Sequence, residues 1–252
     1  EDVASSLAVL SDGKILVAGF ATISAKRAFA VARCLANGTP DPDFGTNGRV
    51  TTSFGTFGPS YGDVGAGMTV QGDGSIVVVG TVTGYGDSNI GIARYTSSGS
   101  LDPTFNGTGK VSASISSNGD VGRTVIVQSD GKILVCGAAF YSNWDSALLR
   151  LNSDGTLDTD FGNGGKVVTD LTSGGDWAND MALQGDGRIL VAGDTYGPYT
   201  FAMLRFMPDG SPDGSFGSGG RVSTPFGNID EGGYGVALQS DGRIVAAGFS
   251  GD

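Results

Sequence analysis

The sequence predicts an all-β chain, a β-propeller of four-stranded antiparallel blades. One nine-residue phrase, of which SDGKILVAG at residues 11–19 is an example, recurs five times. Its Asp-Gly pairs begin at steps of 55 to 61 residues, at Asp12, Asp73, Asp130, Asp186 and Asp241. A fixed period in this range is typical of stacked supersecondary units, each burying its apolar face against the next. The 45 glycines fit many tight turns between short strands.

Four short strands, A to D, emerge in each copy when the copies are aligned on Asp-Gly. Strand A has apolar residues at alternate positions, such as Leu7 and Val9 or Val125 and Val127. The Asp-Gly pair then forms a hairpin turn, because Gly tolerates positive φ. Strand B is a continuous apolar run, such as residues 133–135, and is expected to be buried on both faces. Strand C ends in an arginine, and a long Gly-rich turn leads into strand D.

The chain holds four complete repeats and strands A and B of a fifth. Five blade positions are therefore expected in one propeller domain, residues 1–252, which looks like a segment of a larger secreted protein. Either flanking sequence completes the ring, or the fifth blade is truncated. A truncated blade would leave an exposed strand edge that invites pairing with another chain.

The repeat also resembles a known family. SDGKILVAG, then Arg-x-x-x-x-Gly, then Leu-Asp-x-x-Phe-Gly-x-x-Gly-Lys-Val is similar to the bacterial delta-60 repeat, a β-propeller module. The resemblance covers nearly the whole chain. It implies a large secreted or surface-attached bacterial protein, and it assigns no activity or catalytic residue.

The strand-C arginines are Arg33, Arg94, Arg150 and Arg205. Each emerges from an apolar strand, so its guanidinium needs acceptors. The following C–D turn supplies a carboxylate eight residues later in every copy, at Asp41, Asp102, Asp158 and Asp213. We expect each arginine to bond within its own C–D turn or to the adjacent blade, and so to fix the blade-to-blade register.

Loop length varies only in the B–C and D–A connections, which lie at one end of an antiparallel blade. Both tryptophans and six of the seven tyrosines also fall in or beside these loops. Loops on a rigid scaffold carry binding residues, and amphipathic rings suit sugars and proteins alike. The alternative is that some rings fill gaps between blades. The expected ligand-binding residues are Tyr61, Tyr85, Tyr141, Trp144, Trp177, Tyr196, Tyr199 and Tyr234.

A recurring acid stands ten residues before each Asp-Gly pair, at Asp2, Asp63, Asp120, Asp176 and Glu231. A ring of these carboxylates near the channel mouth would suit Ca²⁺, which takes hard oxygen ligands. Alternatively, each acid caps a turn or pairs with an arginine, and one acid and one arginine per repeat favour this structural role. We therefore expect no cofactor, and Ca²⁺ is the candidate cation should the ring form.

Composition limits the partners and the chemistry. The net charge of −11 argues against nucleic acid and anionic membrane surfaces, and no apolar stretch predicts membrane insertion. The chain has no His, which removes Ser-His-Asp and Cys-His catalysis and imidazole-based zinc sites. Cys34 and Cys136 occupy different phases of the repeat, so we expect buried free thiols rather than a disulfide.

These observations favour a non-catalytic binding or adhesion module of a secreted or cell-surface bacterial protein, with a glycan or protein ligand held by the aromatic loops. One alternative is a metal-dependent hydrolase or lactonase-like propeller enzyme with its site at the central channel. It would need non-repeated polar residues at the axis. Another is a structural spacer or assembly unit that associates through the incomplete fifth blade.

Overall fold

A computed structural model of the chain describes residues 1–55, 62–83, 87–196, 200–226 and 231–251. The described residues form four four-stranded antiparallel sheets and a two-stranded sheet. The first two sheets contain β1 (Asp2–Val9), β2 (Ile15–Ile23), β3 (Lys26–Cys34) and β4 (Arg49–Thr52), then β5 (Val64–Val70), β6 (Ile76–Thr83), β7 (Ser88–Tyr95) and β8 (Lys110–Ala113). The third and fourth contain β9 (Asp120–Val127), β10 (Ile133–Phe140), β11 (Trp144–Leu151) and β12 (Lys166–Thr169), then β13 (Asp176–Leu183), β14 (Ile189–Thr195), β15 (Thr200–Phe206) and β16 (Arg221–Thr224). The fifth contains β17 (Glu231–Leu238) and β18 (Ile244–Ser250).

The strand order inside each sheet follows the chain, so each sheet is a four-stranded meander like a propeller blade. The first strand of each later sheet packs against the first three strands of the sheet before it. The apolar core consequently lies between successive sheets, and strand B is buried along most of its length in β6, β10 and β14. Within the described ranges no helix is long and apolar enough to cross a membrane.

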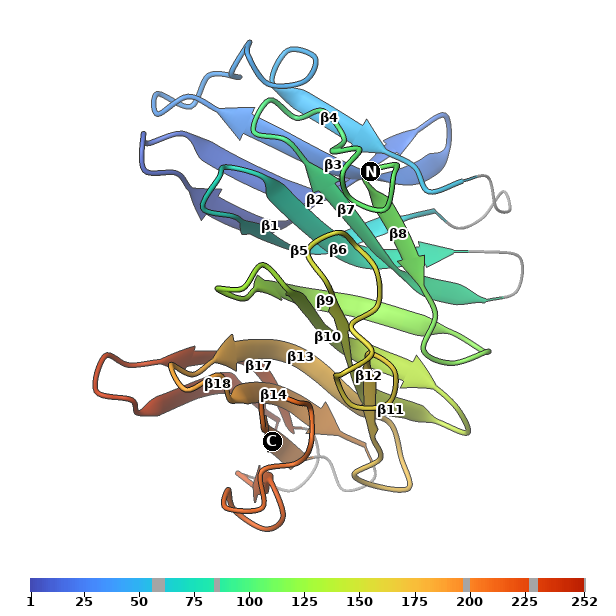
Figure 1. Cartoon of the computed structure of the whole chain (residues 1–252), viewed down its shortest axis with the longest axis vertical. Coiled ribbons are helices and arrows are strands. Elements are labelled where there is room, and N and C mark those ends of the chain that lie inside the picture. Colours follow the sequence, from blue (N-terminus) through green and yellow to red (C-terminus); the bar gives the residue numbers. More distant parts are fainter. Residues whose placement is uncertain (56–61, 84–86, 197–199, 227–230, 252) are drawn as a thin grey trace.

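The sheets follow one another from the first, near the N-terminus, to the fifth, near the C-terminus (Figure 1). Among the residues that the structure describes, the first and fifth sheets lie at opposite ends of this stack and do not close a ring. In the first repeat the strand-A residues Leu7 and Val9 are therefore 64% and 68% exposed. The equivalents of Leu7 in β9 and β13, Val125 and Met181, are each 4% exposed, because a preceding sheet covers these strands. The expected burial of strand B is wrong in the fifth repeat, where Val245 of β18 is 47% exposed.

Glycine is required at two points of the repeated phrase. The glycine of each Asp-Gly turn has φ between +81° and +85°, as the hairpin prediction requires. The glycine that ends the phrase lies beside a β-bulge of strand A, where a Cβ would come within 1.8 to 2.0 Å of a strand-A carbonyl oxygen. The close approach of strands A and B thus explains why the phrase ends in Gly at residues 19, 80, 137, 193 and 248.

The predicted arginine–aspartate pairs are confirmed in all four C–D turns. The Nε atom donates to the aspartate eight residues later at 2.8, 2.7, 2.6 and 2.7 Å, from Arg33, Arg94, Arg150 and Arg205 in turn. In the first three the Nη1 atom also donates to a carbonyl of the next C–D turn, those of Ser97, Ser153 and Pro208, at 2.5 Å. Each guanidinium lies over the turn's phenylalanine ring, 4.3 to 4.7 Å from its centre. These contacts join successive blades.

Both cysteines are free thiols, as expected from their phases. Cys136 on β10 is fully buried, and burial raises the pKa of its thiol to about 12. Cys34, the last residue of β3, is only half-buried, because the strand end lies near the C–D turn rather than between sheets.

Candidate functional site

The B–C turns and the D–A loops meet at the same end of the sheets, as the antiparallel order predicts. The Tyr141 hydroxyl donates to the Ile115 carbonyl at 3.4 Å, joining a B–C turn to a D–A loop. The Asn143 amide donates to the Gly174 carbonyl at 2.5 Å. The variable segments around the third sheet therefore form one continuous surface. Of the expected binding residues, Tyr61, Tyr85 and Tyr199 lie outside the described residues.

Trp144 and Trp177 come together from neighbouring sheets, with ring centres 4.8 Å apart. Neither lies in a loop: Trp144 begins β11, because the B–C turn of the third sheet spans only residues 141–143, and Trp177 is the second residue of β13. Phe140 packs edge-on against Trp144 at 5.3 Å, and the Arg123 guanidinium lies 4.9 Å from the centre of the Trp177 ring. Both indoles are half-buried, and their rings contact one another and their neighbours. The tryptophan pair thus fills the gap between two blades.

Tyr141, one of the residues expected to bind a ligand, lines a cavity. Its side chain is 48% exposed in the B–C turn of the third sheet. It lines a depression of about 600 Å³ that continues along β12 to the C–D turn. The lining combines apolar and polar side chains, those of Ile115, Tyr141, Asn163, Lys166 and Val168. Its volume lies in the range of small-molecule sites, about 300 to 1,000 Å³.

The two remaining tyrosines are exposed and lie apart from this depression. Tyr196 directly follows β14, is 42% exposed and donates its backbone N–H to the Gly175 carbonyl at 2.6 Å. Tyr234 is 59% exposed within β17 and stacks on Phe249 of β18, with ring centres 5.4 Å apart. Tyr234 therefore covers the fifth sheet instead of extending the surface around Tyr141.

The recurring acids bond the D–A loops. In four repeats the carboxylate accepts a backbone N–H four residues after the strand-D valine, as in Phe54 to Asp63 at 2.7 Å and Phe226 to Glu231 at 2.6 Å. Asp120 and Asp176 accept the corresponding N–H of Ile115 and Leu171. Asp2 instead accepts the Thr22 N–H at 2.9 Å. This geometry is the turn-capping alternative, and of these five acids Asp176 alone joins a group of three described acids that could hold a metal ion.

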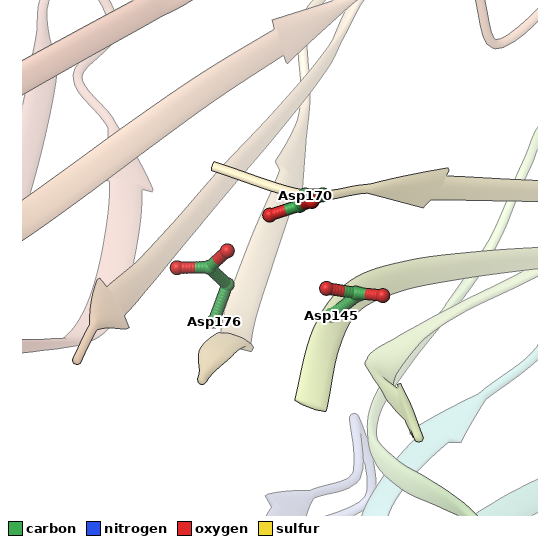
Figure 2. Close-up of side chains that lie close together, drawn as sticks. All are labelled: Asp145, Asp170 and Asp176. Carbon is green, nitrogen blue, oxygen red and sulfur yellow. The ribbon is translucent and has the colours of Figure 1, made fainter. Parts of the chain in front are cut away.

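The group consists of Asp145 on β11, Asp170 just after β12 and Asp176 at the start of β13. Figure 2 shows the three carboxylates facing a common space between the third and fourth sheets. One oxygen from each lies within 4.8 Å of the others. Asp145 and Asp176 are 6% and 0% exposed, and Asp170 is exposed. Burial and the neighbouring Asp170 and Asp176 charges raise the pKa of Asp145, and burial chiefly raises the pKa of Asp176.

Asp145 and Asp170 were not predicted as site residues. They do not belong to the repeated pattern, so a search for acids that recur in every repeat does not find them. The available signal is positional: Asp145 stands five residues before a strand-C arginine and Asp170 three residues after a strand-D valine, where the other copies have no acid.

Comparison with known protein families identifies the family of the chain. A family model described as "Domain of unknown function (DUF5122) beta-propeller" matches residues 10–44, 71–105, 128–161 and 184–216, together more than half of the chain. The chain belongs to this family. The matched DUF5122 segments run from each Asp-Gly turn to the phenylalanine of the C–D turn. This result supports the predicted β-propeller repeat and does not extend to the delta-60 name.

Solved structures share the fold of this DUF5122 chain. A Dyadobacter fermentans protein of unknown function is similar with a TM-score of 0.56 and 11% identity, over 98% of this chain and 75% of that one. The alpha-L-arabinofuranosidase of Lactobacillus brevis is similar with a TM-score of 0.51 and 12% identity, over 98% and 85%. At these identities the likeness shows the fold alone. A comparison with curated protein sequences finds no match.

Proposed function

We propose that this chain is a non-catalytic, glycan-binding module of a secreted or surface-attached bacterial protein. The observation that carries the proposal is the depression that extends from Tyr141, an exposed amphipathic ring at the variable end of the sheets, along β12 to the polar side chains of Asn163 and Lys166. Sugar rings present an apolar face and a rim of hydroxyls. An exposed tyrosine can stack on the first, and Asn163 and Lys166 can bond the second.

The net charge of the chain favours one class of glycan. At −11 the protein repels polyanions, so a neutral glycan is favoured over nucleic acid or an acidic polysaccharide. Lys166 provides a local donor without reversing that overall field. A protein ligand is the competing outcome of the same experiment.

The test is a glycan array probed with the whole chain, followed by calorimetric titration of any ligand found. Tyr141→Ala should weaken binding about tenfold or more, as loss of one aromatic anchor does. Its melting temperature should stay near that of the parent, because the residue is 48% exposed and its hydroxyl makes only one long hydrogen bond, at 3.4 Å. No bound glycan, or equal affinity of the variant, would refute the proposal.

Two further variants separate binding from packing. Tyr234→Ala removes a still more exposed tyrosine from the fifth sheet and should leave the affinity unchanged. Trp144→Ala should lower the melting temperature, because its ring fills the gap between two blades. If Trp144→Ala instead abolished binding at unchanged stability, the ligand would lie on the tryptophan pair.

The hydrolase alternative rests on a different observation, the non-repeated acids Asp145 and Asp170. Glycoside hydrolysis uses carboxyl groups on both sides of the scissile bond, separated by about 5 to 9.5 Å. Oxygens within 4.8 Å of one another suit a shared cation better. Turnover of chromogenic glycosides or lactones by the metal-loaded chain would support the enzyme instead.

A further inference from the structure

The junction between the third and fourth sheets differs in charge from the other three junctions. At each, three positions meet: the fifth residue before the strand-C arginine, the third after the strand-D valine and the recurring acid. Elsewhere the first two positions are uncharged. They are Ala28 and Ser53, Asn89 and Ser114, and Thr200 and Pro225, whereas the third junction has Asp145 and Asp170.

Strand register brings these two aspartates together. Ser146 pairs with Thr169 and Ala147 with Val168, so the next step along β11 and β12 places Asp145 opposite Asp170. Like charges directly opposite one another in an antiparallel pair are destabilising. Asp176 brings a third carboxylate from the next sheet. None of the ion pairs formed by the described residues involves any of the three.

Asp145 provides an independent sign of a ligand. Its side chain is 6% exposed, and its buried Oδ1 atom has no hydrogen-bond partner among the described residues. Figure 2 shows its carboxylate directed toward the other two. A buried, unpaired carboxylate oxygen is costly unless a cation or donor occupies the space in front of it.

Asp176 retains capacity for a cation while it caps its loop. Its Oδ2 accepts the N–H groups of Leu171 and Thr172 at 2.6 and 3.0 Å, and its Oδ1 accepts the Thr172 hydroxyl at 3.0 Å. A carboxylate offers about four lone-pair positions, so one remains on Oδ1. Asp170 is exposed, which gives an ion a path from solvent.

We propose that Asp145, Asp170 and Asp176 form a Ca²⁺ site between the third and fourth blades. All-carboxylate ligation selects a hard cation. The three oxygens lie within 4.8 Å of one another, so one ion can contact all of them. Ca²⁺ accepts several protein carboxylates in a flexible geometry, whereas Mg²⁺ usually keeps several waters and binds one or two carboxylates. The proposal is independent of glycan binding.

The bound ion would stabilise a particular junction. It would link β11, the end of β12 and the start of β13, next to Trp144 and Trp177 in sequence. At the other junctions the neutral residues need no such ion. Calcium would therefore act as a structural cross-link inside the stack, between its third and fourth sheets.

The experiment compares chelator-treated parent with Asp145→Asn and with the double variant Asp145→Asn, Asp170→Asn. Calorimetry with CaCl₂ should show one saturable site in the parent, and Ca²⁺ should raise its melting temperature. Each variant should bind about tenfold more weakly or not at all, since affinity depends on ligand charge. In chelator the variants should melt no lower than the parent, because like-charge repulsion is removed.

Asp43→Asn is the matched control, since it removes one exposed carboxylate far from the site and should bind Ca²⁺ like the parent. An absence of binding heat and of thermal shift in the parent would overturn the proposal. Unchanged Ca²⁺ affinity in the double variant would do the same. An equal response to MgCl₂ would overturn the assignment of calcium.

Discussion

At the residue scale, Arg150 shows how one side chain joins two blades. It bonds Asp158 of its own turn at 2.6 Å and the Pro208 carbonyl of the next at 2.5 Å, while only 7% exposed. Removing one partner of a buried ion pair costs about 3–5 kcal/mol. Lys132 remains 2.9 Å from Asp158, so we expect Arg150→Ala to lose about 3 kcal/mol, near the lower end of that range, in urea unfolding.

The control for this prediction is Arg243→Ala. The Arg243 side chain is 79% exposed and pairs with a half-exposed Asp241, so its removal should have little effect on unfolding. If Arg150→Ala unfolds at the same urea concentration as the parent, the strand-C arginines contribute nothing to stability and do not fix the register between blades.

Asp213 predicts how stability depends on pH. Hydrogen bonds from Ser215, followed by the contacts of Arg205, lower the pKa of its carboxyl to about 2. The unfolded value is about 3.9, so the folded state favours the ionised form. The resulting stabilisation is fully present above about pH 4 and is lost as pH falls through about 2. Asp213→Asn should be less stable than the parent at neutral pH.

The difference between parent and Asp213→Asn should narrow as the solution is acidified. Urea unfolding at neutral pH and at steps down to about pH 2 measures it, because the protonated parent then resembles the amide variant. A difference that stays constant over this range would show that the charge of Asp213 contributes nothing to folding.

At the scale of elements, repetition made the strands and the arginine–aspartate pairs predictable. Alternation identified strand A, a continuous apolar run identified strand B, and the constant spacing from Arg150 to Asp158 recurred in four copies. Each pattern expresses a local rule of geometry that every repeat obeys. The structure follows these rules wherever a neighbouring sheet is present.

Single-copy features were harder to predict because register, rather than local pattern, brings them together. Asp145 and Asp170 are 25 positions apart in the chain, and only the pairing of β11 with β12 makes them neighbours. The tryptophans were correctly placed at the loop end. Their packing against Arg123 and Phe140 depends on the angle between two sheets. The periodicity of the sequence does not predict that angle.

At the scale of the whole molecule, the two ends of the stack expose apolar faces. β1 presents Val3, Leu7 and Val9, and β18 presents Val245 and Phe249. Each face is the repeat equivalent of one that is covered inside the stack, where the first strand of one sheet packs on the sheet before it. The two ends are therefore complementary to each other by construction. β18 also has a free edge in its two-stranded sheet as described.

We accordingly expect the isolated chain to associate head to tail, with the fifth sheet of one copy on the first sheet of the next. Such a heterologous contact adds copies one after another until a ring closes, so the mean mass measured by light scattering should rise with concentration. Leu7→Asp should suppress this rise, because it places a charge where an apolar face must be buried. Leu157→Asp, at an exposed position in a C–D turn away from both faces, should associate like the parent. A strict monomer at high concentration would show that the end faces do not recognise each other, and the assembly-unit alternative would then fail.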